Sequence, residues 1–202
     1  MRNLQKNMLG FLKKLKKNKD LDHQRLEVCI SGSGGQGIIL FGMILAEAIG
    51  IYEGKNVVQT QSYGPESRGG ASRCEVIASQ GEILYPKTME LDVLLALNQE
   101  ALDKNISRLK KSGTLIFDSF FVKKTPKGIK NTYALPFSQI ANLELGNILA
   151  ANIVALGALA IITKIVLVES LEQVLKKRIK EKFLELDNKA LKLGITRARA
   201  LI

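Results

Sequence analysis

A glycine-rich segment, GSGGQG at positions 32–37, has the spacing in this 202-residue chain that is best suited to chemistry. Gly32, Gly34 and Gly37 match the G-x-G-x-x-G pattern, with Gly35 between them, directly after a predicted strand and before a predicted helix. Glycines let the backbone turn tightly and approach a ligand, and free N–H groups at a helix start favour an anion. We therefore expect these four glycines to face a ligand or a partner. The alternative is a tight turn that packs helix against strand without a ligand.

Two common uses of such a segment fit the neighbouring sequence poorly. Dinucleotide-binding proteins carry an acidic residue at the end of the second strand, where this chain has Thr60, Gln61 and Ser62, and Glu53 precedes that strand. A P-loop has lysine after its last glycine, where this chain has Ile38. The sequence therefore weakens the nicotinamide and flavin interpretations and excludes a P-loop.

A polar loop after the second predicted strand is the other candidate site. Its residues of interest are Tyr63, Glu66, Arg68, Gly69 and Gly70. Because the ends of strands in a doubly wound sheet meet at one edge, we expect this loop to lie near the glycine segment. An arginine guanidinium binds carboxylates and phosphates, and adjacent glycines let a partner surface approach. A solvated surface loop without a ligand is the alternative.

Other reactive groups are scarce in this chain. A single histidine, His23, and two cysteines leave little room for a Ser-His-Asp triad, a disulfide scaffold or a cysteine-ligated iron–sulfur cluster. We expect Cys29 and Cys74 to be reduced core residues. We expect Asp92 and Asp118 to cap strand ends rather than to bind a ligand. No catalytic residue and no metal ligand is predicted here.

Alternating strands and helices are predicted to position the two loops. Strands are predicted at 26–31, 56–60, 73–78, 82–85, 91–97, 114–118 and 131–135, and helices at 38–50, 99–111, 148–162, 169–177 and 180–193. A tight turn at 79–81 is expected to join two of these strands in a hairpin, Pro136 to begin a turn, and Gly194 to end the last helix. This order predicts an α/β fold with three α/β/α layers, a mixed, mostly parallel sheet with one hairpin, and a helical C-terminal part.

Much of the formal net charge of +11 lies in residues 1–25, which hold eight basic and two acidic residues. We therefore divide the chain into a basic N-terminal extension, 1–25, and one domain, 26–202. Apolar residues of the extension recur at helical spacing, so a helix that binds a membrane or a partner is one alternative, and a solvated extension is the other. The extension lacks the aromatic interleaving of single-strand binders, so no nucleic-acid partner is predicted.

The apolar run at 148–162 is shorter than the ~20 residues that a membrane-spanning helix needs. We expect a buried helix there and no transmembrane segment. No secretory signal is evident in the basic extension. With reduced cysteines, these features predict a cytoplasmic protein.

Five ordered blocks together resemble the gamma subunit, or gamma domain, of the 2-oxoacid:ferredoxin oxidoreductases. The blocks are GSGGQG at 32–37, YGPESRGGAS at 63–72, LDVLLALNQEAL at 91–102, AANIVALGAL at 150–159 and DNKALKLG at 187–194. The resemblance covers about residues 26–194, so residues 26–202 are expected to form a gamma-type oxidoreductase domain. Within the pyruvate, ketoisovalerate and 2-oxoglutarate members, the sequence is most similar to the 2-oxoglutarate branch.

The resemblance implies a subunit that is inactive alone, in a complex that converts a 2-oxoacid and coenzyme A to acyl-CoA, carbon dioxide and reduced ferredoxin. It further implies that alpha and beta subunits, often with a ferredoxin-like delta subunit, hold thiamine diphosphate, Mg²⁺ and [4Fe–4S] clusters, while this chain alone holds none. Coenzyme A is then a co-substrate and ferredoxin the electron acceptor. The two loops would form the partner-facing edge beside the thiamine site and the coenzyme A approach.

Other interpretations stay open on the sequence alone. The chain could be a stand-alone dinucleotide-binding protein, or it could belong to the pyruvate or branched-chain branch of the same family. A third interpretation is an adaptor that binds a membrane or nucleic acid through its basic extension. It also stays open whether the glycine segment contacts coenzyme A, thiamine diphosphate or only a partner chain.

Overall fold

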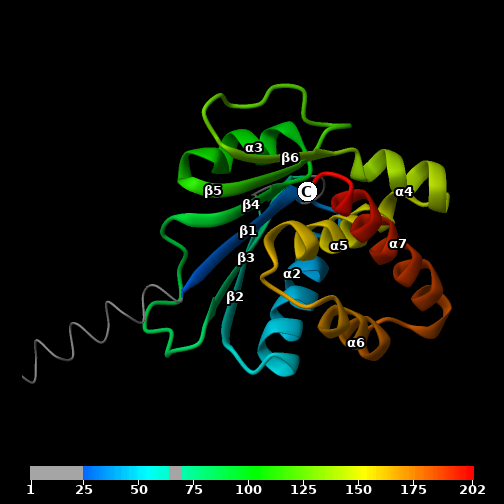
Figure 1. Cartoon of the computed structure of the whole chain (residues 1–202), viewed down its shortest axis with the longest axis horizontal. Helices are drawn as coiled ribbons and strands as arrows, with labels where there is room; N and C mark the ends of the chain where they lie inside the picture. The colour runs from blue at the N-terminus through cyan, green and yellow to red at the C-terminus, as the bar shows by residue number, and fades with distance from the viewer. Residues whose placement is uncertain (1–24, 64–69) are drawn as a thin grey trace, which may run out of the picture.

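The structure is a computed structural model, and it describes residues 25–63 and 70–202. One six-stranded sheet forms its centre, in the order β2-β3-β1-β4-β5-β6 (Figure 1). The strands are β1 Leu26–Ser33, β2 Asn56–Tyr63, β3 Ala71–Ser79, β4 Leu91–Ala96, β5 Leu109–Asp118 and β6 Asn131–Leu135. Strands β1, β4, β5 and β6 are parallel, and β3 is antiparallel to both of its neighbours. The predicted mixed, mostly parallel sheet is confirmed.

The helices cover the two faces of this sheet unequally. They are α2 Ile38–Glu47, α3 Gln99–Asn105, α4 Phe137–Leu145, α5 Ala151–Thr163, α6 Val168–Arg178 and α7 Glu181–Arg199. A π-helical turn, η1 Ala48–Tyr52, continues α2, and short 3₁₀ turns, η2 Ile106–Arg108 and η3 Ile148–Ala150, follow α3 and precede α5. Figure 1 shows α3 on one side of the sheet and α2, α5, α6 and α7 on the other. The α/β/α layering and the helical C-terminal part are as predicted.

The two hydrophobic clusters follow the alternation of side chains along the central strands. In β4, Val93 and Leu95 join the cluster beneath α2 and α5, while Leu94 and Ala96 join the cluster beneath α3. A strand buried on both faces reads as a continuous apolar run, which is the pattern that predicted this strand.

The predicted hairpin is wrong in its second strand. Residues 82–85 form no strand, and β3 instead pairs with β2 on one side and β1 on the other, with Ile77 opposite Val58 and Glu27. Since both edges of β3 are occupied, residues 82–85 have no free edge to pair with. The consecutive strands that pair antiparallel are therefore β2 and β3.

Several helical segments also differ from the prediction. The helix predicted at 99–111 ends at Asn105, and β5 begins at Leu109 because this segment pairs with Leu91 of β4. Pro136 is followed by a helix, α4, whose Phe137 and Ile140 are buried in the main cluster. Proline lacks a backbone N–H, so it is tolerated at a helix start.

Gly194 does not end the last helix, which continues to Arg199. A side chain at Gly194 would collide with the backbone oxygen of Val154 in α5, and Gly157 of α5 meets the backbone of α7 at Leu191 in the same way. Gly194 is therefore required by the close approach of two helices, not by a helix end.

The apolar run at 148–162 forms η3 and the buried helix α5, as predicted. Among residues 25–63 and 70–202, no helix combines the length and the apolar character that crossing a membrane requires. The helix predicted in the basic extension lies outside the described residues.

Candidate functional site

The glycine segment joins the end of β1 to the start of α2. Gly37 lies directly before α2 with a φ of 71°, in the left-handed region that favours glycine. A Cβ atom at Gly37 would also collide with the side-chain amide of Asn152 in α5, whose Nδ2 lies 3.4 Å from the Gly37 carbonyl oxygen. Asn152 is buried, so this contact fixes one end of the segment against α5.

The other end of the segment meets the loop between β2 and β3. The Gly34 N–H donates to the Gly70 carbonyl oxygen at 2.8 Å, so Gly70, the described end of the second loop, lies beside the glycine segment as expected. Gly34 and Gly35 are exposed, Gly35 has a φ of 93°, and open space surrounds the position of its absent side chain. The tip therefore presents bare backbone to solvent.

The remaining residues predicted in the second loop are only partly placed. Glu66, Arg68 and Gly69 lie outside the described residues. The backbone of Tyr63 pairs with Ser72 across β2 and β3, which places it at the same edge of the sheet.

Asn98, which the sequence analysis did not single out, holds the glycine segment from the side of β4. Its Nδ2 donates to Ser33 Oγ at 2.7 Å and lies 3.4 Å from Gln36 Oε1, which itself accepts from the Ser33 N–H at 2.7 Å. Its Oδ1 accepts from the Ala101 N–H at 2.8 Å and caps α3. An asparagine directly before a helix is an N-cap signal, so this residue was detectable from the sequence.

Gln99 extends the same line of contacts to the loop after β5. Its Oε1 accepts from the N–H groups of Lys123 and Lys124, both at 2.9 Å, and its Nε2 donates to the Lys124 carbonyl oxygen at 2.9 Å. Asn98 and Gln99 therefore connect three loops at the carboxyl edge of the sheet.

Both aspartates identified in the sequence act as caps, as predicted. Asp118 is fully buried and accepts from the Ser138 N–H (3.0 Å), the Ser138 hydroxyl (2.5 Å) and the Phe120 N–H (2.9 Å). Burial raises the pKa of the Asp118 carboxyl above its ordinary value. Asp92, at the start of β4, accepts from the Glu27 N–H and pairs with Lys110 at 2.7 Å.

The two cysteines are core residues, as predicted. Cys29 and Cys74 are fully buried and form no disulfide. Burial raises the pKa of the Cys29 thiol to about 12 and also raises that of Cys74, so neither is an activated thiolate. Within the described residues, no cluster of histidine, cysteine, aspartate and glutamate has the grouping that a metal ion needs.

Large apolar side chains are exposed at or near this edge. Phe120 and Phe121 follow β5, Leu143 lies on α4, and Ile148 and Leu149 lie in η3, which leads into the helix that carries Asn152. A shallow groove of about 320 Å³ lies between β6, α4 and α7, and is lined by Leu135, Pro136, Gln139, Ile140, Leu143, Glu144 and Arg197. Exposed apolar side chains mark a protein interface where they form one contiguous patch.

Comparison with known proteins gives consistent matches. Residues 27–197 match the family model of pyruvate ferredoxin/flavodoxin oxidoreductase. The chain is similar to 2-oxoglutarate synthase subunit KorC of Methanocaldococcus jannaschii, with 46% identity over 158 residues that cover 77% of this chain and 84% of that protein.

Solved structures agree in fold along most of the chain. The gamma subunit of a keto/oxoacid ferredoxin oxidoreductase from Geobacter sulfurreducens has a TM-score of 0.80 and 46% identity, covering 87% of this chain and 97% of that chain. A 2-oxoglutarate:ferredoxin oxidoreductase from Magnetococcus marinus, with 2-oxoglutarate, coenzyme A and succinyl-CoA bound, has a TM-score of 0.77 and 28% identity, covering 89% of this chain and 32% of that chain. Because the family model matches residues 27–197, well over half of the chain, the chain belongs to the pyruvate ferredoxin/flavodoxin oxidoreductase family.

Proposed function

We propose that this chain is the gamma subunit of a 2-oxoglutarate:ferredoxin oxidoreductase. The complex would convert 2-oxoglutarate and coenzyme A to succinyl-CoA and carbon dioxide, passing two electrons to ferredoxin. The observation that carries the proposal is the 46% identity with a 2-oxoglutarate synthase subunit. The bound 2-oxoglutarate, coenzyme A and succinyl-CoA in the related Magnetococcus enzyme support the same reaction.

In this proposal the chain completes an active centre that other subunits equip. Thiamine diphosphate with Mg²⁺ on a partner supplies the electron sink for decarboxylation, and partner [4Fe–4S] clusters carry the electrons. This chain contributes the bare backbone of Gly34 and Gly35, held in place through Asn98 and Asn152. A preorganised loop lowers the entropic cost of binding a ligand or a partner surface.

The partners in this proposal are alpha and beta subunits, with a ferredoxin-like delta subunit in some complexes. The proposed location of the complex is the cytoplasm. The exposed apolar side chains of α4 and η3 support a permanent interface, because permanent interfaces are more apolar than the rest of the protein surface. The nine residues proposed to face cofactor or partner are Gly32, Gly34, Gly35, Gly37, Tyr63, Glu66, Arg68, Gly69 and Gly70. Arg68 is proposed to attract anions or to pair with a partner carboxylate.

Purification of the complex from cells, followed by a 2-oxoacid panel, tests this proposal. Reduction of a viologen dye is measured with 2-oxoglutarate, pyruvate and 2-oxoisovalerate, with and without coenzyme A. We expect 2-oxoglutarate to give the highest kcat/KM and the reduction to require coenzyme A. A preference for pyruvate would assign another branch, and a chain that is stabilised alone by NAD(P) or FAD would contradict the subunit role.

A further inference from the structure

The loop between β5 and β6, residues 119–130, is a strongly basic surface that the catalytic proposal does not use. We call it the basic loop. It contains four lysines and no acidic residue, and all four lysines are exposed: Lys123, Lys124, Lys127 and Lys130. Among the ion pairs of the described residues, none involves these lysines. Their charge is therefore available to a partner.

An aromatic pair lies at the start of the basic loop. The rings of Phe120 and Phe121 meet edge to face, with centroids 4.9 Å apart, and remain 42% and 40% exposed. Lys123 Nζ lies 5.7 Å from the centre of the Phe120 ring. The backbone of the pair is fixed, since the Phe120 N–H donates to the buried Asp118 carboxylate and the Phe121 N–H to the Asp118 carbonyl oxygen. The basic loop therefore presents two fixed, exposed aromatic side chains to solvent, with Lys123 beside one of them.

The basic loop is continuous with the edge that carries the glycine segment. Gln99 binds the loop through the backbone of Lys123 and Lys124, and the adjacent Asn98 binds Ser33 of the glycine segment. Of the two acidic residues on α3, Glu100 is paired with Lys104 and Asp103 accepts from Gln99 Nε2. These contacts leave the loop as the positively charged end of the edge.

The composition of this surface indicates what kind of partner it fits. Lysines are depleted in the cores of protein interfaces, and permanent interfaces are the more apolar ones, whereas brief electron-transfer contacts are small. A basic surface also steers an acidic partner and speeds its encounter in a manner that salt suppresses. Four exposed lysines and two exposed aromatic side chains in one loop fit a brief contact with an acidic protein better than a permanent one.

We propose that the basic loop docks the ferredoxin that the complex reduces, through carboxylates of that protein and an apolar contact over Phe120 and Phe121. The inference rests on the proposed function, which supplies the ferredoxin. The loop orients and attracts the carrier, while the electrons pass between clusters on other chains.

Charge reversal in the assembled complex tests this docking surface. The variant is Lys124→Glu with Lys127→Glu, assayed with 2-oxoglutarate and either ferredoxin or a viologen dye. We expect the KM for ferredoxin to rise about tenfold at low ionic strength, because the steering is lost, and its dependence on salt to weaken. Viologen-linked turnover should stay unchanged, because a small dye needs no docking surface.

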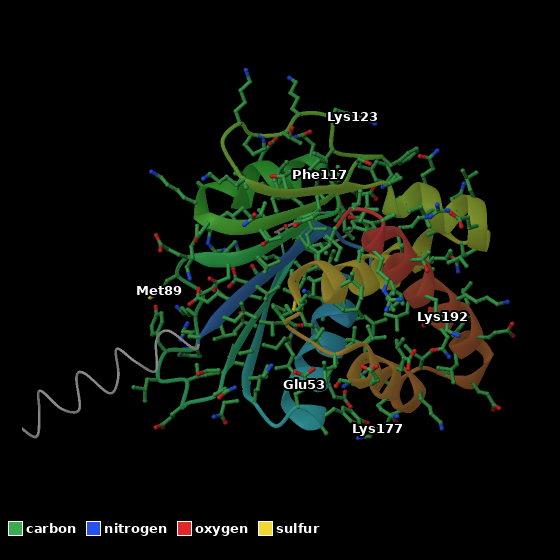
Figure 2. The ribbon with its side chains drawn as sticks, viewed as in Figure 1. Glu53, Met89, Phe117, Lys123, Lys177 and Lys192 are labelled. Atoms are coloured by element: carbon green, nitrogen blue, oxygen red, sulfur yellow. The ribbon has the colours of Figure 1, made fainter. Side chains whose placement is uncertain are left out.

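A matched control places the same charge change elsewhere. Lys176→Glu with Lys192→Glu alters two exposed lysines of α6 and α7. Figure 2 shows Lys192 on the side of the molecule away from Lys123. This control should leave the KM for ferredoxin within about twofold of the parent value, as is usual for surface changes away from a binding site.

Two results would overturn the docking proposal. One is an unchanged KM for ferredoxin in the Lys124→Glu and Lys127→Glu complex. The other is failure of the complex to assemble, which would make the loop a permanent subunit interface. Failure of the unaltered complex to reduce viologen with 2-oxoglutarate would instead contradict the proposed function.

Discussion

Asn98 performs two separable tasks with one side-chain amide. Its oxygen caps α3 through the Ala101 N–H, and its nitrogen holds Ser33 at the start of the glycine segment. A short polar side chain with an oxygen suffices for the first task, whereas the second needs an N–H donor that reaches across to β1. Substitution can therefore remove one task and keep the other.

We expect Asn98→Ser to keep the cap and to release the glycine segment. Amide hydrogen exchange should speed up at residues 33–37 in this variant, while residues 99–105 exchange as in the parent. Asn98→Ala should speed up exchange in both segments and cost a further 0.5–2 kcal/mol or so of unfolding free energy, the typical value of a lost cap. Unchanged exchange at 33–37 in both variants would show that Asn98 does not hold the segment.

Cys29 makes the stability of the chain depend on alkaline pH. Burial raises the pKa of its thiol from 9.0 to about 12 in the folded chain, so the unfolded chain releases this proton first. Between these values the folded state binds more protons, and the unfolding free energy falls as pH rises, by up to about 1.4 kcal/mol per pH unit. Below pH 9 this contribution is fully present.

Cys29→Ala removes the thiol and should therefore flatten the alkaline part of the profile. We expect the stability difference between parent and variant to shrink between pH 8 and pH 10.5, as measured by denaturant unfolding. The two proteins differ only at residue 29, so the comparison isolates the thiol. Parallel profiles across this range would argue against a raised pKa.

Among the elements, helices α5 and α7 approach each other closely because glycine occupies the contact positions. Gly157 and Gly194 each face the backbone of the other helix, at Leu191 and Val154. No side chain can move aside to relieve a collision there, because the obstructing atoms belong to the main chain.

Gly194→Ala should for this reason lower the unfolding free energy by about 1–3 kcal/mol, the usual cost of overpacking a core. The sign is informative, because alanine in an unobstructed helix is favoured over glycine by about 1 kcal/mol. Thermal or denaturant unfolding measures the change, and Lys192→Ala on the exposed face of α7 serves as the control. A more stable Gly194→Ala variant would mean that the two helices do not meet at this residue.

Elements that depend on a local sequence pattern could be predicted. Elements that depend on pairing between distant segments could not. The continuous apolar run of β4 and the glycine segment between β1 and α2 are local signals, and strand direction correctly placed Gly34 beside Gly70. Residues 82–85 have a β-like sequence, but β3 already has two neighbours. Gly194 resembled a helix end because glycine often follows the last turn of a helix. Its actual role, the contact with Val154 of α5, depends on a helix that is distant in sequence.

The same distinction applies to the candidate site. Glycine spacing identified the segment, but the side chains that hold it, Asn98 and Asn152, come from elements far along the chain. Asn98 carried a local N-cap signal. Asn152 stood out as the polar residue of an otherwise apolar run, but that position alone does not show that its partner is Gly37. The predicted roles of Glu66 and Arg68 stay predictions.

At the scale of the whole molecule, the carboxyl edge of the sheet collects the features that suit a shared active centre. Bare glycine backbone, buried amides and exposed apolar side chains lie at or near it, with the basic loop at its end. Within the described residues, the buried Asp118 carboxylate at this edge is committed to capping, and both thiols are buried. We therefore propose that this edge binds and orients the partners of the active centre.

Reconstitution from separate subunits shows whether the chain completes an active centre that its partners equip. Partner subunits prepared without this chain are mixed with the purified chain, and viologen reduction by 2-oxoglutarate and coenzyme A is followed. We predict negligible turnover by the chain alone and by the partners alone, and coenzyme A-dependent turnover when the two are combined. Turnover of 2-oxoglutarate by the isolated chain, or full activity of the partners without it, would contradict the account.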